Sequence, residues 1–140
     1  MFNQQLMLPN AAFDYVIDGV YIKTIVADSK GYIDYNIFYE KKIRFITKPL
    51  IAVISLAFIT NFGISPIFYF ASLHIDNSII IWSISKIRAL TKITLQTKLK
   101  SIRSSPTRNS LILCTSDDKI ITLDVTPFLN EGAKKREHED

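Results

Sequence analysis

The sequence is poor in the residues that metal centres, disulfide frameworks and nucleotide-binding loops require. Its 140 residues include one cysteine and two histidines. These cannot supply the nitrogen and sulfur ligands of a structural zinc site, and a single cysteine forms no disulfide within the chain. The four glycines are isolated from one another, so neither a dinucleotide fingerprint nor a phosphate-binding loop can be drawn. We therefore predict no metal site and no cofactor.

Groups suited to catalysis are also scarce. His74 lies two residues before Asp76, where we expect a turn-capping or surface imidazole rather than a general base. Asp117 and Asp118 are adjacent carboxylates, but neighbouring residues at a strand end point in different directions, and a hairpin turn alone accounts for them. The sequence predicts no catalytic residue, and we do not expect an enzyme.

The N-terminal residues lack the pattern of a secretory signal, because residues 1–10 include Asn3, Gln4, Gln5 and Pro9. The single cysteine, Cys114, lies in the apolar run 110–115, where a buried free thiol is expected. Both features favour an intracellular protein, cytoplasmic or nuclear. The net charge of +4 is modest for a dedicated binder of nucleic acid.

Residues that favour β-strands are abundant. With 48% hydrophobic and 21% charged residues, the composition is that of one globular domain. Residues 13–128 consist of short runs rich in Ile, Phe, Tyr and Thr between clusters of Asp, Asn, Ser, Gly and Pro. Residues 1–12 are predicted to be an N-terminal extension and 129–140 a charged C-terminal tail. The runs predict an all-β fold with strands at 21–27, 32–38, 42–47, 51–58, 67–72, 79–84, 89–95, 99–103, 110–115 and 120–125.

One arrangement of turn and strand recurs along the chain. Asp76 precedes Trp82 by six residues, and Asp117 precedes Leu123 by the same number. A looser copy begins at Lys30, so the turns are separated by 46 residues (76 − 30) and 41 residues (117 − 76). Self-similarity at periods of roughly 20–50 residues is typical of repeat architectures. The spacing therefore predicts repeated units of four short strands.

The motifs on this period resemble those of WD-repeat β-propellers. Ala71-Ser72, Asp76 to Ile79 and Ile81-Trp82 are similar to the second hairpin of a blade, and residues 53–58 are similar to its innermost strand. Leu123-Asp124 stands where the Trp-Asp pair of the family is placed. The resemblance implies structural repeat anchors at Gly31, Asp76, Trp82, Asp117 and Asp124.

One family feature is missing. The Gly-His pair expected before the first strand of a blade is not found near residues 48–50 or 97–100. Without that histidine, we do not expect the side-chain hydrogen-bond chain typical of the family to form in full.

The resemblance implies an incomplete β-propeller of two to three four-stranded antiparallel blades. The sheet of a blade is apolar on both faces, and a ring takes at least about four blades. The chain is therefore expected to be a fragment of a larger propeller, to add blades to another protein, or to form a partial solenoid. We expect a non-catalytic protein–protein interaction scaffold that binds a protein partner or a second copy through unpaired blade faces and the rim loops 61–66 and 76–78. Trp82 is expected in the core.

A membrane protein is the main alternative. Residues 49–73 carry no charge and are long enough to cross a bilayer core of about 30 Å as a helix, and four cationic residues lie between 41 and 48. However, four polar or helix-breaking residues fall between 61 and 66, at the centre of this segment. Two strands joined by a loop fit that centre better.

A third alternative rests on a basic stretch. Residues 86–108 contain seven cationic residues and no acidic residue, and such a stretch is able to contact RNA phosphates or an anionic surface. The same residues suit the outward positions of an edge strand, where Lys and Arg discourage aggregation, and we favour that interpretation. The residues are Lys86, Arg88, Lys92, Lys98, Lys100, Arg103 and Arg108.

Overall fold

A computed structural model describes residues 12–38, 41–60, 67–106 and 108–129. Within these ranges the chain forms three antiparallel sheets. The first holds β1 (Ala12–Asp18), β2 (Tyr21–Ala27), β3 (Ile33–Ile37) and β4 (Lys41–Phe45). The second holds β5 (Val53–Ile59), β6 (Tyr69–His74), β7 (Ser78–Ser83) and β8 (Arg88–Thr94). The third holds β9 (Leu99–Ser104), β10 (Ser110–Thr115) and β11 (Ile120–Asp124), followed by the helical turn α2 (Thr126–Leu129).

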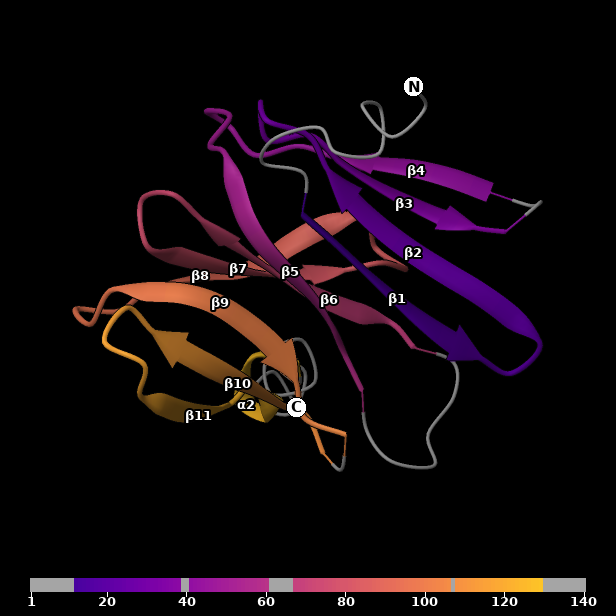
Figure 1. Ribbon diagram of the computed structural model, residues 1–140. Coiled ribbons are helices and arrows are strands. Elements are labelled where there is room, and N and C mark those ends of the chain that lie inside the picture. The colour runs from indigo at the N-terminus through magenta and orange to yellow at the C-terminus, as the bar shows by residue number, and fades with distance from the viewer. Residues whose placement is uncertain (1–11, 39–40, 61–66, 107, 130–140) are drawn as a thin grey trace, which may run out of the picture.

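The three sheets lie side by side in chain order (Figure 1). In each sheet the strands pair in sequence order, and the first strands β1, β5 and β9 contact one another in series. This is the arrangement of successive blades around the axis of a β-propeller, and the described residues do not close a ring. The predicted fold class, an all-β incomplete propeller, is confirmed. Within the described residues the third sheet has three strands rather than the four predicted for each unit.

Each sheet has two faces that differ in what covers them. We call the face of a sheet that is turned toward the preceding sheet its front face and the opposite face its back face. In the first sheet, the front face is the one turned away from the second sheet. The back face of the first sheet, with Ile25 and Ile33, packs against the front face of the second, with Phe70 and Trp82. The back face of the second sheet packs in the same way on the front face of the third. The residues of this second contact include Leu73, Ile79, Ile81, Leu99, Ile102, Leu111 and Leu113.

The second sheet is therefore covered on both sides. Every residue of β7 is buried, and the run Ile79 to Trp82 is apolar without alternation because both faces of the strand meet a neighbouring sheet. The same burial explains why residues 49–73 look like a membrane segment in the sequence. Where the structure describes them, they form β5 and β6, and the transmembrane alternative is wrong there. No helix among the described residues is long and apolar enough to cross a membrane. The predicted rim loop 61–66 lies outside the described residues.

The three turns that carry the repeat are structurally equivalent. Ala27 pairs with Ile33, Leu73 with Ile79 and Cys114 with Ile120, which leaves residues 28–32, 74–78 and 115–119 between the partners. The fourth residue of each turn has a positive φ, and its N–H donates to the carbonyl of the first. These residues are Gly31 (φ 110°), Asn77 (67°) and Asp118 (66°). Lys30, Asp76 and Asp117, from which the predicted spacing was counted, are each the third residue of their turn and are therefore equivalent.

Strand β1 was not predicted, and the strand begins at Ala12. Its large apolar residues Phe13, Tyr15 and Ile17 are exposed, whereas the alternate residues, which include Asp14 and Asp18, face the second sheet together with Ala12 and Val16. Asp18 is buried in an ion pair with Lys23, at 2.5 Å, and accepts the N–H of Ile67 at 2.6 Å. Carboxylates normally face water and large apolar side chains normally face the core. The sequence of β1 therefore suggests the wrong face of the strand as the buried one.

Polar side chains also connect the first strands of the three sheets. Asp14 of β1 accepts the N–H of Phe58 of β5 at 2.8 Å. The hydroxyl of Ser55 accepts the N–H of Ile102 of β9 at 3.0 Å and donates to its carbonyl at 3.2 Å. These bonds replace backbone pairing between strands that belong to different sheets.

Two smaller differences concern the end of the chain. Cys114 is half-buried rather than buried, because it points to the back face of the third sheet, which no further sheet covers in the described residues. The residues after β11 form the helical turn α2, with Phe128 and Leu129 packed against the core between the second and third sheets.

The substitution Gly31→Ala tests the close approach between the first and second sheets. A Cβ at Gly31 meets the carbonyl oxygen of Ile51 at 2.6 Å, and φ is 110°. We expect the free energy of unfolding to fall by roughly 2–4 kcal/mol, measured by urea denaturation. Gly19→Ala is the matched control, because Gly19 has φ 65° but no neighbouring atom within 4 Å. Its expected loss is about 1 kcal/mol, and equal losses at both sites would contradict the packing argument.

Candidate functional site

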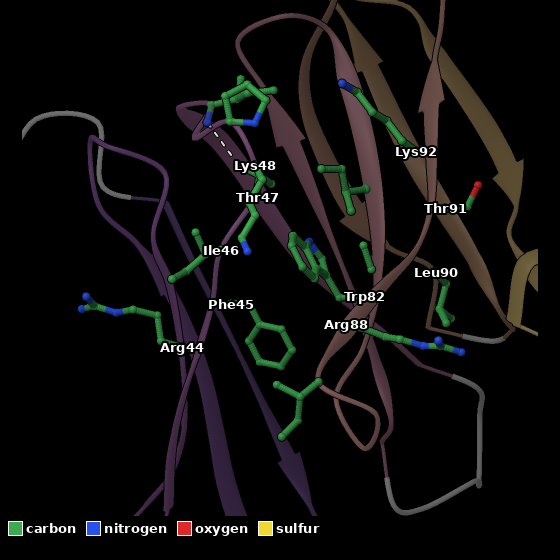
Figure 2. A pocket seen from close by; sticks show the side chains of 15 residues that line it. Arg44, Phe45, Ile46, Thr47, Lys48, Trp82, Arg88, Leu90, Thr91 and Lys92 are labelled. Carbon is green, nitrogen blue, oxygen red and sulfur yellow. Dashed lines mark hydrogen bonds between the residues drawn. The ribbon is translucent and has the colours of Figure 1, made fainter.

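A groove separates the outer strands of the first and second sheets. It has a volume of about 680 Å³ and lies between β4 with the residues after it and the β7–β8 hairpin. Phe45, Ile80 and Trp82 form a buried apolar floor. Figure 2 shows Phe45 and Trp82 directed toward each other from the two sheets, with ring centroids 5.6 Å apart in an edge-to-face arrangement. The floor is thus part of the interface between the sheets.

Four cationic residues line this groove and no acidic residue does. In Figure 2, Lys48 and Lys92 lie on opposite walls at one end of the groove, whereas Arg44 and Arg88 point away from it. Arg44 instead binds Asp34 through two hydrogen bonds, Nε to Oδ1 at 2.8 Å and Nη2 to Oδ2 at 3.2 Å. The positive charge inside the groove therefore comes from Lys48 and Lys92.

A buried chain of hydrogen bonds supports the floor. Trp82 Nε1 donates to Ser72 Oγ at 2.8 Å, and Ser72 Oγ lies 2.6 Å from His74 Nε2. His74 Nδ1 lies 3.0 Å from the carbonyl oxygen of Ile51. With the proton on Nδ1, the indole donates to the hydroxyl, the hydroxyl to Nε2, and Nδ1 to the carbonyl, so each group is satisfied. These hydrogen bonds fix the plane of the buried Trp82 ring beneath the groove.

His74 corrects the sequence interpretation in two ways. It is fully buried rather than a surface or turn-capping residue, and burial lowers the pKa of its imidazole. A side-chain hydrogen-bond chain also forms without the Gly-His pair, because the histidine comes from the end of β6. Ser72 and His74 are two residues apart on one strand and therefore share a face. The Ser-x-His spacing within a predicted strand is therefore the sequence feature that could have indicated the hydrogen bond between Ser72 and His74.

The predicted repeat anchors occupy different kinds of position. Gly31 lies at the close approach to Ile51, and Trp82 is buried on β7. Asp76 accepts hydrogen bonds from the hydroxyl and N–H of Ser78, which hold the pKa of its carboxyl below the usual value. Asp117 is exposed in the turn between β10 and β11, and Asp124 ends β11.

The structure separates the basic stretch 86–108 into several places, although all seven cationic residues are exposed. Arg88 and Lys92 lie on the edge strand β8, Lys100 and Arg103 on β9, and Lys86, Lys98 and Arg108 in the connections. Lys92 lies 3.6 Å from Asp76, and Lys100 forms an ion pair with Asp118. Because β8 is the outermost strand of its sheet and β9 the first strand of the next, the stretch does not form one continuous basic surface. Of its seven cationic residues, Arg88 and Lys92 line the groove, and Arg88 points away from it (Figure 2).

A smaller hollow of about 370 Å³ lies along the first strands β1, β5 and β9. Asp14, Arg103 and three serine hydroxyls contribute to its lining. Burial raises the pKa of Asp14, while the N–H of Phe58 and the charge of Arg103 oppose that rise. Among the residues that the structure describes, no three His, Cys, Asp or Glu side chains are placed to hold a metal ion.

Comparison with solved structures agrees with the arrangement of sheets. The crystal structure of the Cps50 (Swd1) beta-propeller domain from Myceliophteria thermophila superposes with a TM-score of 0.54 at 11% identity, over 81% of this chain. The fold is that of a β-propeller. The chain spans 38% of the length of that propeller chain. No protein-family model and no curated protein matches the sequence.

The pH dependence of stability tests the buried histidine. Because burial lowers the pKa of His74 below the ordinary 6.5, the unfolded chain binds a proton that the folded protein resists. The stabilisation from neutral His74 is complete above about pH 6.5 and declines as the pH falls below it. We expect the difference in unfolding free energy between wild type and His74→Gln to shrink between about pH 7.5 and 5.5 in urea titrations. A difference that stays constant over this range would contradict a neutral buried imidazole.

Proposed function

We propose that this protein is a non-catalytic scaffold of WD-repeat type that binds other proteins and works within a larger propeller or assembly. The observation that carries the proposal is the front face of the first sheet. On β1 the side chains of Phe13, Tyr15 and Ile17 are 65%, 60% and 68% exposed. Such residues on one strand form an apolar surface of the kind that marks protein interfaces.

The surface extends across the neighbouring strand. The register of β1 and β2 places Phe13 opposite Val26 and Ile17 opposite Ile22, and all four side chains are exposed. Residues opposite each other in a sheet share a face, so the apolar side chains are continuous. A large apolar surface of this kind is costly to leave in water.

The position of this face within the fold supports a protein partner. The corresponding face of the second sheet is covered by the first sheet, and that of the third by the second. The front face of the first sheet has the same place in the repeat and the same apolar character. We infer that its partner is another β-sheet, supplied either by a second protein or by a second copy of this chain.

The double substitution Tyr15→Lys and Ile17→Lys tests this role. Both side chains are exposed, so the circular dichroism spectrum of a β protein should persist while association is lost. We expect the wild-type chain to elute in size-exclusion chromatography with light scattering as a larger species and the double variant as a monomer. Val20→Lys is the matched control, because Val20 is 90% exposed but lies in the turn beyond β1. Association that survives the double substitution would contradict the proposal.

We also propose an intracellular location. Cys114 is a free, half-buried thiol, and exposed or half-buried free thiols persist in reducing compartments. A fluorescent fusion distinguishes a cytoplasmic or nuclear signal from a secreted one.

A further inference from the structure

We propose that the groove between the first and second sheets is a binding site for an extended acidic peptide segment with apolar side chains between its carboxylates. This site is separate from the front face of the first sheet. It lies between β4 and β8, which are the outermost strands of their sheets in the described residues.

The positive charge of the groove favours a negatively charged ligand. Lys48 and Lys92 stand on opposite walls at one end, and no acidic side chain lines the groove (Figure 2). Asp76 lies 3.6 Å from Lys92, but both are half-exposed, so that ion pair is weak and open to exchange. Among the described residues Lys48 has no ion-pair partner. Two lysines facing one space repel a cationic ligand and attract carboxylates.

The apolar part of the groove selects a peptide over a simple anion. Its floor consists of Phe45, Ile80 and Trp82, and its rim presents Ile46 and Ile87, which are 44% and 52% exposed. The floor is already buried, so the exposed apolar surface is that of the rim: a hydrated phosphate or carboxylate alone leaves Ile46 and Ile87 in water, whereas an apolar side chain covers them. A volume of about 680 Å³ is within the range of roughly 300–1,000 Å³ that holds compact ligands.

The flanking strand edges favour an extended ligand. Edge strands present backbone N–H and C=O groups on their unpaired side, and a peptide strand is able to hydrogen-bond along such an edge. In an extended peptide, alternate side chains point to opposite sides. A carboxylate near Lys48 and Lys92 and an apolar side chain over Trp82 are therefore compatible with one short segment.

Trp82 provides a direct measurement because it is the only tryptophan in the sequence. We would titrate the full chain with a capped peptide of about eight residues that alternates glutamate and leucine, following both Trp82 emission and heat by calorimetry. We expect saturable binding with a change in Trp82 emission. The same peptide with lysine in place of glutamate, and an oligoglutamate without leucine, should bind at least about tenfold more weakly.

A charge-reversal variant of the groove provides the second part of the experiment. Lys48→Glu should weaken binding of the glutamate–leucine peptide by roughly 5- to 30-fold, since it removes one attraction and adds a repulsion. Lys98→Glu is the matched control, because Lys98 is also exposed but does not line the groove, and it should change binding less than about twofold.

Three outcomes of the peptide titrations overturn the proposal, and a fourth is a preference for RNA. The first three are equal binding of the glutamate and lysine peptides, equal effects of Lys48→Glu and Lys98→Glu, and tight binding of oligoglutamate alone, which would indicate a simple anion site. Preferential binding of single-stranded RNA over the peptide, with a steep loss in salt, would assign the groove to nucleic acid instead. The Tyr15→Lys and Ile17→Lys variant should still bind the peptide, so failure of the groove and failure of the front-face proposal are distinguishable.

Discussion

The packing of the back face of one sheet against the front face of the next holds this protein together. The second sheet shows it most clearly, because both of its faces are covered and β7 is buried along its whole length. Burial of one large apolar side chain contributes about 1.5–3 kcal/mol, so these two contacts are the main source of stability. They also explain why a single sheet of this kind is insufficient alone. The front face of the first sheet is apolar and no other sheet of the described residues covers it, so it is the clearest candidate for a partner.

Polar residues fix how neighbouring sheets meet. Asp18 accepts the N–H of Ile67, just before β6, and is paired with Lys23. Burial and the charge of Asp18 raise the pKa of Tyr35 to about 12. Asp14 makes the corresponding bond to the N–H of Phe58 in the second sheet, and His74 ties strand β6 to Ile51, just before β5. Among the described residues no buried side-chain nitrogen or oxygen lacks a hydrogen-bond partner. Because an unsatisfied buried polar group costs stability, these bonds favour one relative placement of the sheets over others.

The strands and their period were predictable to a large extent, and the contacts between sheets were not. The turns at Gly31, Asp76 and Asp117 carry small, acidic or positive-φ residues, and these local preferences are visible in the sequence. Strand β1 was missed because its acidic residues face inward, where Asp14 and Asp18 accept backbone N–H groups from the second sheet. His74 was misplaced for a related reason, since its burial depends on Ser72, Trp82 and the distant carbonyl of Ile51.

The sequence by itself determined the all-β composition, the position of most strands and the spacing of equivalent turns, because side-chain alternation and turn chemistry act between residues close in the chain. Only the tertiary structure decided which face of each sheet is covered and where the groove lies. Phe45 and Trp82 form its floor together, and Lys48 and Lys92 its charged end, although neither pair is close in sequence. Such contacts depend on how the sheets stack, and stacking follows from the total apolar area that the sheets bury together rather than from any local pattern.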